Sequence, residues 1–154
     1  MKHLNSLSNL LRVAVGESAS SEKSPSIINS VEASSIDVAI NLMNAYMSRE
    51  LNLSHCKIIV FSEAVAIEGI SDEIYTLMNN VQLRPSTNII VSKNDAFSYI
   101  KNVYPLLENL LTKYYDIFPN SSQYTGYVAN VTLGDFFNSL VCNTCEPFAI
   151  LGRS

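Results

Sequence analysis

The run His55-Cys56-Lys57-Ile58-Ile59-Val60-Phe61 is the stretch that best indicates the fold of this chain. Its apolar part is unbroken and contains neither glycine nor proline, which is typical of a strand covered on both faces in a parallel sheet. A second apolar run, at residues 87–92, predicts another strand of the same kind. Four of their side chains are expected to be buried in central strands: Ile58, Val60, Ile89 and Val91.

Helices are predicted around these strands, because apolar residues recur at helical spacing between them. The predicted helices lie near residues 36–47, 63–69, 71–84, 95–103, 105–114 and 133–141. Shorter apolar runs at residues 10–16 and 147–151 predict two further strands. This alternation is typical of an α/β fold with a mixed or mostly parallel central sheet and helices flanking its faces.

Local signals predict where two of the helices begin and end. Ser71, followed by Asp72 and Glu73, has the pattern of an N-cap with acidic residues in the first turn. The same helix is expected to end at Arg84, because the residue before a proline is driven out of the α region. Thr132 is predicted to cap the last helix.

Length and charge limit the classes of function. The chain has 154 residues, 47% hydrophobic and 16% charged, and is predicted to form a single domain over residues 1–154. Its formal net charge is −4 and its pI is near 5.1. Lysine and arginine do not cluster, which excludes nucleic acid and a polybasic membrane patch as partners. No apolar run approaches the roughly 20 residues of a membrane span, so the chain itself is expected to be soluble.

The three cysteines are predicted to be free thiols. Cys142 and Cys145 have the C-x-x-C spacing of thiol redox proteins, in which a helix N-terminus stabilises the thiolate. Here the motif follows a predicted helix, so the helix dipole would disfavour a thiolate. A structural zinc site needs four ligands, and too few other candidates remain. We therefore expect no metal and no cofactor.

No catalytic constellation is visible in the sequence. His55 adjoins Cys56, but neighbouring side chains on a strand point to opposite faces and cannot act as base and nucleophile. We expect His55 to lie at a strand entry. Glu63 and Arg84 lie near helix ends beside strands, and our preferred interpretation is an internal ion pair between them. Contact of Arg84 with a partner is the alternative. The chain is predicted not to be an enzyme.

A succession of short motifs resembles a known family. The motifs are Glu32-Ala33, the H-x-K-x-x-x-x-x-E-x-x-A block over residues 53–66, the helix end at residues 79–84, the strand at residues 89–91 and Val131-Thr132-Leu133-Gly134-Asp135-Phe136. With them, residues 31–151 resemble the N-terminal domain of the Ger(x)C family, the C subunits of bacterial spore nutrient germinant receptors. Asn79 and Val81 stand where the family usually has arginine and proline, and Ser62 where it usually has glycine.

The resemblance implies a lipoprotein at the outer face of the spore inner membrane. It would work beside the A and B subunits of the receptor, in a complex that senses nutrients and triggers germination. The lipid anchor and the later domains are not in this chain, so we expect it to be an excised part of a longer protein. His55, Glu63 and Arg84 match motif positions and are candidate structural or interaction residues, and no catalytic residues are carried over.

Two other functions remain open as alternatives. One is a thiol redox protein that uses Cys142 and Cys145. The other is a soluble module that binds a small-molecule germinant directly. The sequence does not indicate such a ligand site, because it has no recognisable arginine poised with paired acids for an amino-acid ligand.

Overall fold

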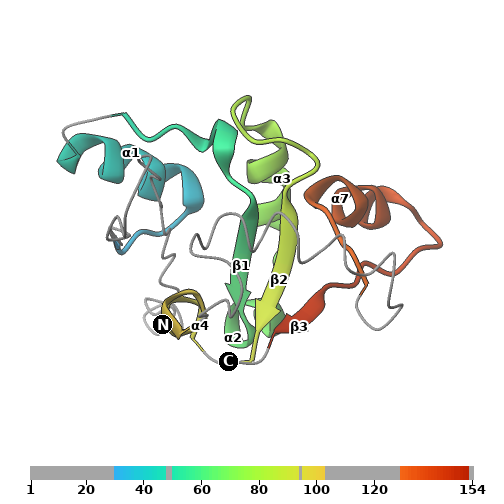
Figure 1. Ribbon diagram of the computed structural model, residues 1–154. Helices are drawn as coiled ribbons and strands as arrows, with labels where there is room; N and C mark the ends of the chain where they lie inside the picture. The colour runs from blue at the N-terminus through green and yellow to red at the C-terminus, as the bar shows by residue number, and fades with distance from the viewer. Residues whose placement is uncertain (1–29, 48–49, 94, 103–128, 153–154) are drawn as a thin grey trace, which may run out of the picture.

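The computed structural model describes residues 30–47, 50–93, 95–102 and 129–152. Its sheet has three parallel strands in the order β1 (Ile58–Ser62), β2 (Asn88–Ser92) and β3 (Ile150–Gly152), as Figure 1 shows. β2 is therefore the central strand of this sheet. The predicted α/β fold with a parallel sheet and flanking helices is confirmed.

The register of the strands gives the sheet two apolar faces. Ile59 pairs with Ile89 and Val60 pairs with Ile90, so side chains of equal parity share a face. Phe61 joins Ile59 and Ile89 in the larger apolar cluster. Ile90 and Tyr99 form a smaller buried cluster on the opposite face, and Ile58 and Val60 pack against it.

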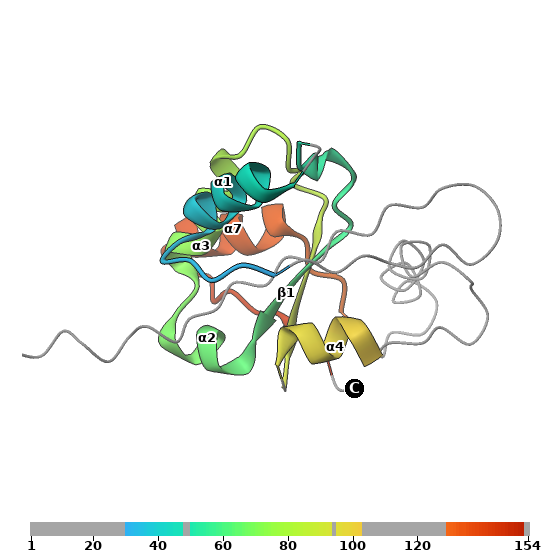
Figure 2. The same cartoon turned by 90° about the vertical axis from the view of Figure 1, so that its left-hand side faces the viewer.

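The helices cover these two faces unequally, as Figure 2 shows. One face carries α1 (Ile36–Tyr46), α3 (Ser71–Asn79) and α7 (Leu133–Val141), and the other carries α4 (Ala96–Asn102). The short helix α2 (Glu63–Glu68) follows β1 directly and has no buried residue. The buried residues of the larger cluster are Ile36, Met43, Leu51, Leu53, Phe61, Ile70, Ile74, Leu77, Leu83, Ile89, Val131, Leu133 and Phe136.

The N-terminus of α7 is fixed by a capping box, as the sequence predicted for Thr132. The Thr132 hydroxyl accepts a hydrogen bond from the Asp135 amide at 3.2 Å, and the Asp135 carboxylate accepts one from the Thr132 amide at 3.2 Å. The amides of Leu133 and Gly134 donate to the carbonyls of Thr87 and Pro85 at 2.7 and 2.8 Å. The first amides of α7 are thus satisfied by the chain that leads into β2.

The helix over residues 71–84 was predicted with both ends misplaced. Ser71 is the first helical residue, and Ile70 occupies the N-cap without a side-chain hydrogen bond. The helix ends at Asn79, five residues before Arg84. Asn80 explains the early end, because its side-chain oxygen accepts the Gln82 amide at 2.9 Å and so stabilises a turn in place of another helical turn.

The predicted burial of the strands is only partly correct. Ile89 is fully buried in β2, whereas Ile58, Val60 and Val91 are half-buried. β1 is an edge strand of the described sheet, so Ile58 and Val60 have neighbours on fewer sides than the residues of β2. Val91 belongs to β2 but lines an open hollow beside α2 and α7. Phe61 and Ile90, which also come from the two predicted strands, are buried.

Two predicted elements lie outside the described residues. They are the strand at residues 10–16 and the helix at residues 105–114. The other expected elements are present, with β3 beginning three residues later than the apolar run at residues 147–151. None of the helices in the described ranges is long and apolar enough to cross a membrane.

Candidate interaction surfaces

Three of the sequence motifs meet at the amino end of the sheet. The Leu53 amide donates to the Gln82 side chain at 3.0 Å, and the Asn88 amide donates to the Lys57 carbonyl at 3.1 Å. The motif at residues 131–136 joins them through the hydrogen bonds of α7 to the loop at residues 85–87. We call these segments, residues 53–57, 82–88 and 131–134, the amino-end platform.

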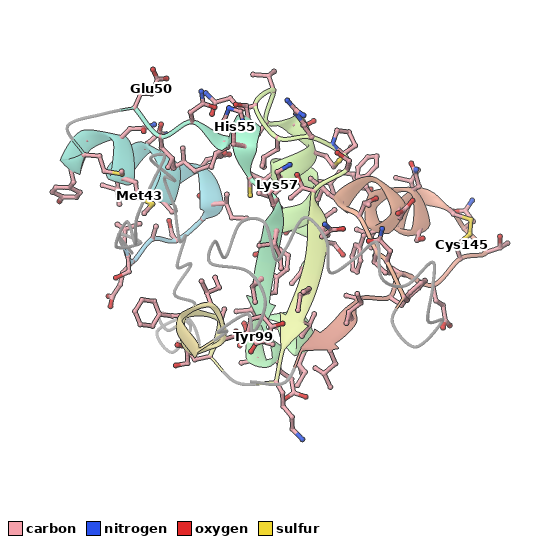
Figure 3. The ribbon with its side chains drawn as sticks, in the orientation of Figure 1. Met43, Glu50, His55, Lys57, Tyr99 and Cys145 are labelled. Atoms are coloured by element: carbon pink, nitrogen blue, oxygen red, sulfur yellow. A yellow bond between two sulfur atoms is a disulfide. The ribbon has the colours of Figure 1, made fainter. Side chains whose placement is uncertain are left out.

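The amino-end platform displays two of the candidate residues, His55 and Arg84. His55 closes a 3-10 turn over Leu53–His55, and its side chain is exposed (Figure 3). His55 thus lies in this turn and not at the strand entry that we expected. The turn is stabilised by Asn52, whose side-chain oxygen accepts a hydrogen bond from the Ser54 amide at 2.9 Å. Arg84 lies in the loop before β2 and is also exposed. Both side chains are accessible to a partner.

Glu63 lies at the opposite end of the sheet, so the preferred ion pair with Arg84 is wrong. Glu63 begins α2 directly after β1, and Arg84 precedes β2. Because β1 and β2 run parallel, the end of one strand and the start of the other are separated by the length of the sheet. The two side chains form no ion pair. The direction of the strands, which the sequence analysis had predicted, was the signal that could have excluded it.

Glu63 contributes instead to a groove at the carboxyl end of the sheet. The groove has a volume of about 450 Å³. It lies between α2, the start of α3, the α7 side chains Phe136 and Leu140, and the segment at residues 147–151. We call it the carboxyl-end groove. A second hollow adjoins it, shares Glu63 and Ile67, and is also lined by Lys93 and Asp95.

Two of the three cysteines are not free, contrary to the prediction. Cys142 and Cys145 form a disulfide with a Cα–Cα distance of 5.3 Å. The pair follows α7, as predicted, with Cys142 at the helix C-cap. Cys56 is a free thiol, and burial raises its pKa. Because the thiolate is the reactive form, Cys56 is protected from reaction by the same burial.

The disulfide is expected to be dispensable for germination. It closes a very short loop, and the Cys142 amide already donates to the Asn138 carbonyl at 3.0 Å. We expect Cys142→Ser with Cys145→Ser to lower the free energy of unfolding by about 2 kcal/mol or less. Urea denaturation and the germination rate of spores with the double variant check this. A well-folded double variant that abolishes germination would contradict it and favour the thiol redox alternative.

Metal ligands do not gather in the part of the chain that the structure describes. No group of three or more His, Cys, Asp or Glu side chains is placed there to hold a metal ion. Several acidic side chains lie instead at helix starts, with Glu63 in the first turn of α2 and Asp72 and Glu73 in the first turn of α3. At these positions negative charge interacts favourably with the helix dipole.

Comparison with known proteins assigns the family. The family described as "Spore germination protein N-terminal domain" matches residues 6–151, almost the whole chain. No curated protein and no solved structure matches the chain. The matched range includes every described strand and helix except the final residue of β3, and it contains all the motifs on which the resemblance rests. The chain therefore belongs to the family of spore germination protein N-terminal domains.

Proposed function

We propose that this chain is the N-terminal domain of the C subunit of a nutrient germinant receptor and that it acts through protein contacts. In the full-length protein a lipid anchor would hold it at the outer face of the spore inner membrane, beside the A and B subunits. The family match over residues 6–151 is the observation that carries this proposal. The role in spore germination follows from the family. We propose in addition which subunit the chain belongs to, which partners it has and where it is located.

The amino-end platform supports a role in contact rather than in chemistry. Its backbone is fixed by hydrogen bonds between segments far apart in the sequence, such as that from the Leu133 amide to the Thr87 carbonyl at 2.7 Å. His55 and Arg84 are exposed on it, and the thiol next to His55, that of Cys56, has a pKa raised by burial, which disfavours the nucleophilic thiolate. A rigid surface loses little conformational entropy when a partner binds, so it suits a constitutive subunit interface.

Arg84→Ala is expected to leave the stability of the chain unchanged and to impair nutrient-triggered germination. Because the Arg84 side chain is exposed, the substitution should change the free energy of unfolding by no more than about 0.5 kcal/mol. We expect the same substitution to slow nutrient-triggered germination, since a guanidinium supplies several hydrogen bonds to a partner. Thermal melting of the purified chain and the germination rate of spores check the two parts.

Lys93→Ala is the matched control for Arg84→Ala. Lys93 is an exposed basic residue after β2, at the other end of the sheet. Its replacement removes the same charge, so it should leave germination unchanged if the contact is at the amino-end platform. If both substitutions changed the germination rate equally, Arg84 would act only through its contribution to the net charge and not through a specific contact. If Arg84→Ala strongly lowered the melting temperature, the Arg84 side chain would instead have a role in internal packing.

The location and the partners are tested on whole spores. We expect the protein to fractionate with the spore inner membrane together with the A and B subunits. Deletion of the gene should abolish the response to nutrients while a germination trigger that bypasses nutrient receptors still acts. Recovery of the protein in another compartment, or a normal nutrient response after deletion, would contradict the proposal.

A further inference from the structure

The disulfide between Cys142 and Cys145 lies at the surface of the domain. Figure 3 shows Cys145 and its sulfur–sulfur bond beyond the end of α7, away from the sheet. The Cys145 side chain is exposed and that of Cys142 is half-buried, and neither belongs to the two apolar clusters. A dissolved thiol can therefore reach this disulfide while the domain stays folded, and exposed disulfides are generally the labile ones.

The surroundings of the two sulfur atoms differ. The Thr144 hydroxyl oxygen lies 3.5 Å from the Cys142 Sγ atom. Because a disulfide sulfur carries no hydrogen, the hydroxyl is the donor of this hydrogen bond. When the disulfide breaks, the same hydroxyl can donate to a thiolate on Cys142, and a hydrogen bond to a charged acceptor is the stronger kind. Cys142 is thus the leaving sulfur, and the exposed Cys145 is the sulfur that a thiol attacks.

The end of α7 acts against a lasting thiolate on Cys142. This residue is the C-cap of the helix, where the dipole disfavours negative charge. The hydrogen bond from Thr144 is the stronger effect while the bond breaks, since a charged hydrogen bond generally outweighs the dipole at an exposed helix end. The dipole then favours protonation, and a thiol is a poor nucleophile. The pair is therefore suited to being reduced by other thiols and not to acting as a redox enzyme.

The disulfide closes the turn between α7 and the segment that leads into β3. Residues 143–148 of this segment are exposed and belong to no helix or strand. Pairing of β3 with β2 begins only at Ile150. Within the turn the Cys145 amide donates to the Cys142 carbonyl at 3.4 Å, a long hydrogen bond, so the covalent bond is the firmer link. Pro147 lines the carboxyl-end groove, so the segment forms one wall of that groove.

We propose that the Cys142–Cys145 disulfide is a thiol–disulfide exchange site, and that its reduction by a dithiol frees residues 143–148 while the rest of the domain stays folded. One thiolate of the dithiol attacks the Cys145 Sγ atom, the S–S bond breaks, and Cys142 leaves as a thiolate and takes up a proton. The second thiol of the reductant then displaces Cys145 from the mixed disulfide. Two electrons and two protons pass to the protein, and the dithiol becomes a disulfide.

This exchange goes beyond the proposed function and is compatible with it. Serine at both cysteine positions mimics the reduced pair, and the double serine variant is expected to support germination. The reduced domain is thus a working form. The redox state of the pair sets how firmly one wall of the carboxyl-end groove is held to α7.

Dithiothreitol and a maleimide label test the exchange on the purified chain. After reduction we expect rapid labelling of Cys142 and Cys145 with an unchanged circular dichroism spectrum, and before reduction we expect neither to react. Cys56 is the internal control, because its burial raises the thiol pKa and should slow its labelling about tenfold or more until the chain is unfolded. Three reactive thiols before reduction, or reduction that requires a denaturant, would overturn the proposal.

Variants of Thr144 test the direction of the attack. Thr144→Val removes the hydroxyl and should slow reduction about threefold or more, whereas Thr144→Ser keeps it and should restore the rate. Asn143→Ala changes the neighbouring exposed side chain and should have no effect. A brief reaction with glutathione, quenched with acid, should place most of the mixed disulfide on Cys145. Glutathione mainly on Cys142, or equal rates for all three variants, would overturn the assigned attack.

Nuclear magnetic resonance relaxation measures the freedom of the segment. The order parameters of the amides at residues 143–146 should fall from about 0.85 in the oxidised chain to about 0.6 or below in the reduced chain. Those of α1 should not change. Equal order parameters in the two states would show that the disulfide does not hold the segment. A fall throughout the chain would show that the whole domain depends on the disulfide, and either result would overturn the proposal.

Discussion

Replacement of Ile89 by alanine is expected to lower the free energy of unfolding by about 2–5 kcal/mol. Ile89 is 0% exposed in the central strand and belongs to the apolar cluster under α1, α3 and α7. The substitution removes three carbons from a place where the backbone cannot easily close the cavity, because β1 pairs with Ile89 on one side and the Ile89 amide donates to the Val131 carbonyl on the other. Urea denaturation followed by circular dichroism measures the loss as a lower midpoint with an unchanged slope.

Ile58→Ala is the matched control for Ile89→Ala, because it is the same substitution in the neighbouring strand. Ile58 is half-buried in the smaller cluster and lies in a strand at the edge of the described sheet. Its replacement should cost less than that of Ile89, about 2 kcal/mol or below. Equal losses at the two positions would mean that β1 and β2 are buried alike and would contradict the described sheet order.

Gly152→Ala is expected to destabilise the chain by about 1–3 kcal/mol, although it adds only one methyl group. A Cβ atom at Gly152 would lie 2.7 Å from a ring carbon of Tyr99. Tyr99 belongs to the smaller cluster on the α4 face and is itself buried. Because the ring is buried in this cluster, it has little free space into which it could move away from the new methyl group. Thermal melting of the purified variant measures the effect.

A double-mutant cycle with Tyr99→Leu tests the cause of this loss. Leucine lacks the outer ring atoms that the new methyl group would meet. The cost of Gly152→Ala should then be smaller by about 1 kcal/mol in the Tyr99→Leu background than in the unchanged chain. Strictly additive effects would show that the contact with Tyr99 is not the source of the strain, and that β3 tolerates a side chain at its last position.

Local signals in the sequence predicted those elements whose ends depend on nearby residues. Thr132 and Asp135 are three positions apart and form their capping box without help from the rest of the chain. The end of α3 was missed because two local signals compete there. The proline after Arg84 was taken as the helix stop, but the side chain of Asn80 ends the helix before the chain reaches the proline.

The candidate site was less predictable, because it depends on which ends of the strands come together. Spacing along the chain did not relate Glu63 to Pro147 and Leu151, which line the same groove from distant parts of the sequence. The disulfide could have been predicted, since the C-x-x-C spacing permits it. The odd number of cysteines favoured three thiols in our interpretation, although one free Cys56 and one pair satisfy the same count.

The position of β2 between β1 and β3 determines the order in which the domain can be completed during synthesis. β1 and β2 leave the ribosome first and can pair at once, through Ile59 and Ile89. At Ile89 the other edge of β2 bonds to Val131, but from Ile90 onward it acquires its partner only when Ile150 emerges, late in translation. Until then the nascent chain presents an open strand edge, which is the feature that makes partly folded proteins aggregate. A stop in translation before residue 150 would thus leave a product that chaperones must protect, even though most of its helices are already made.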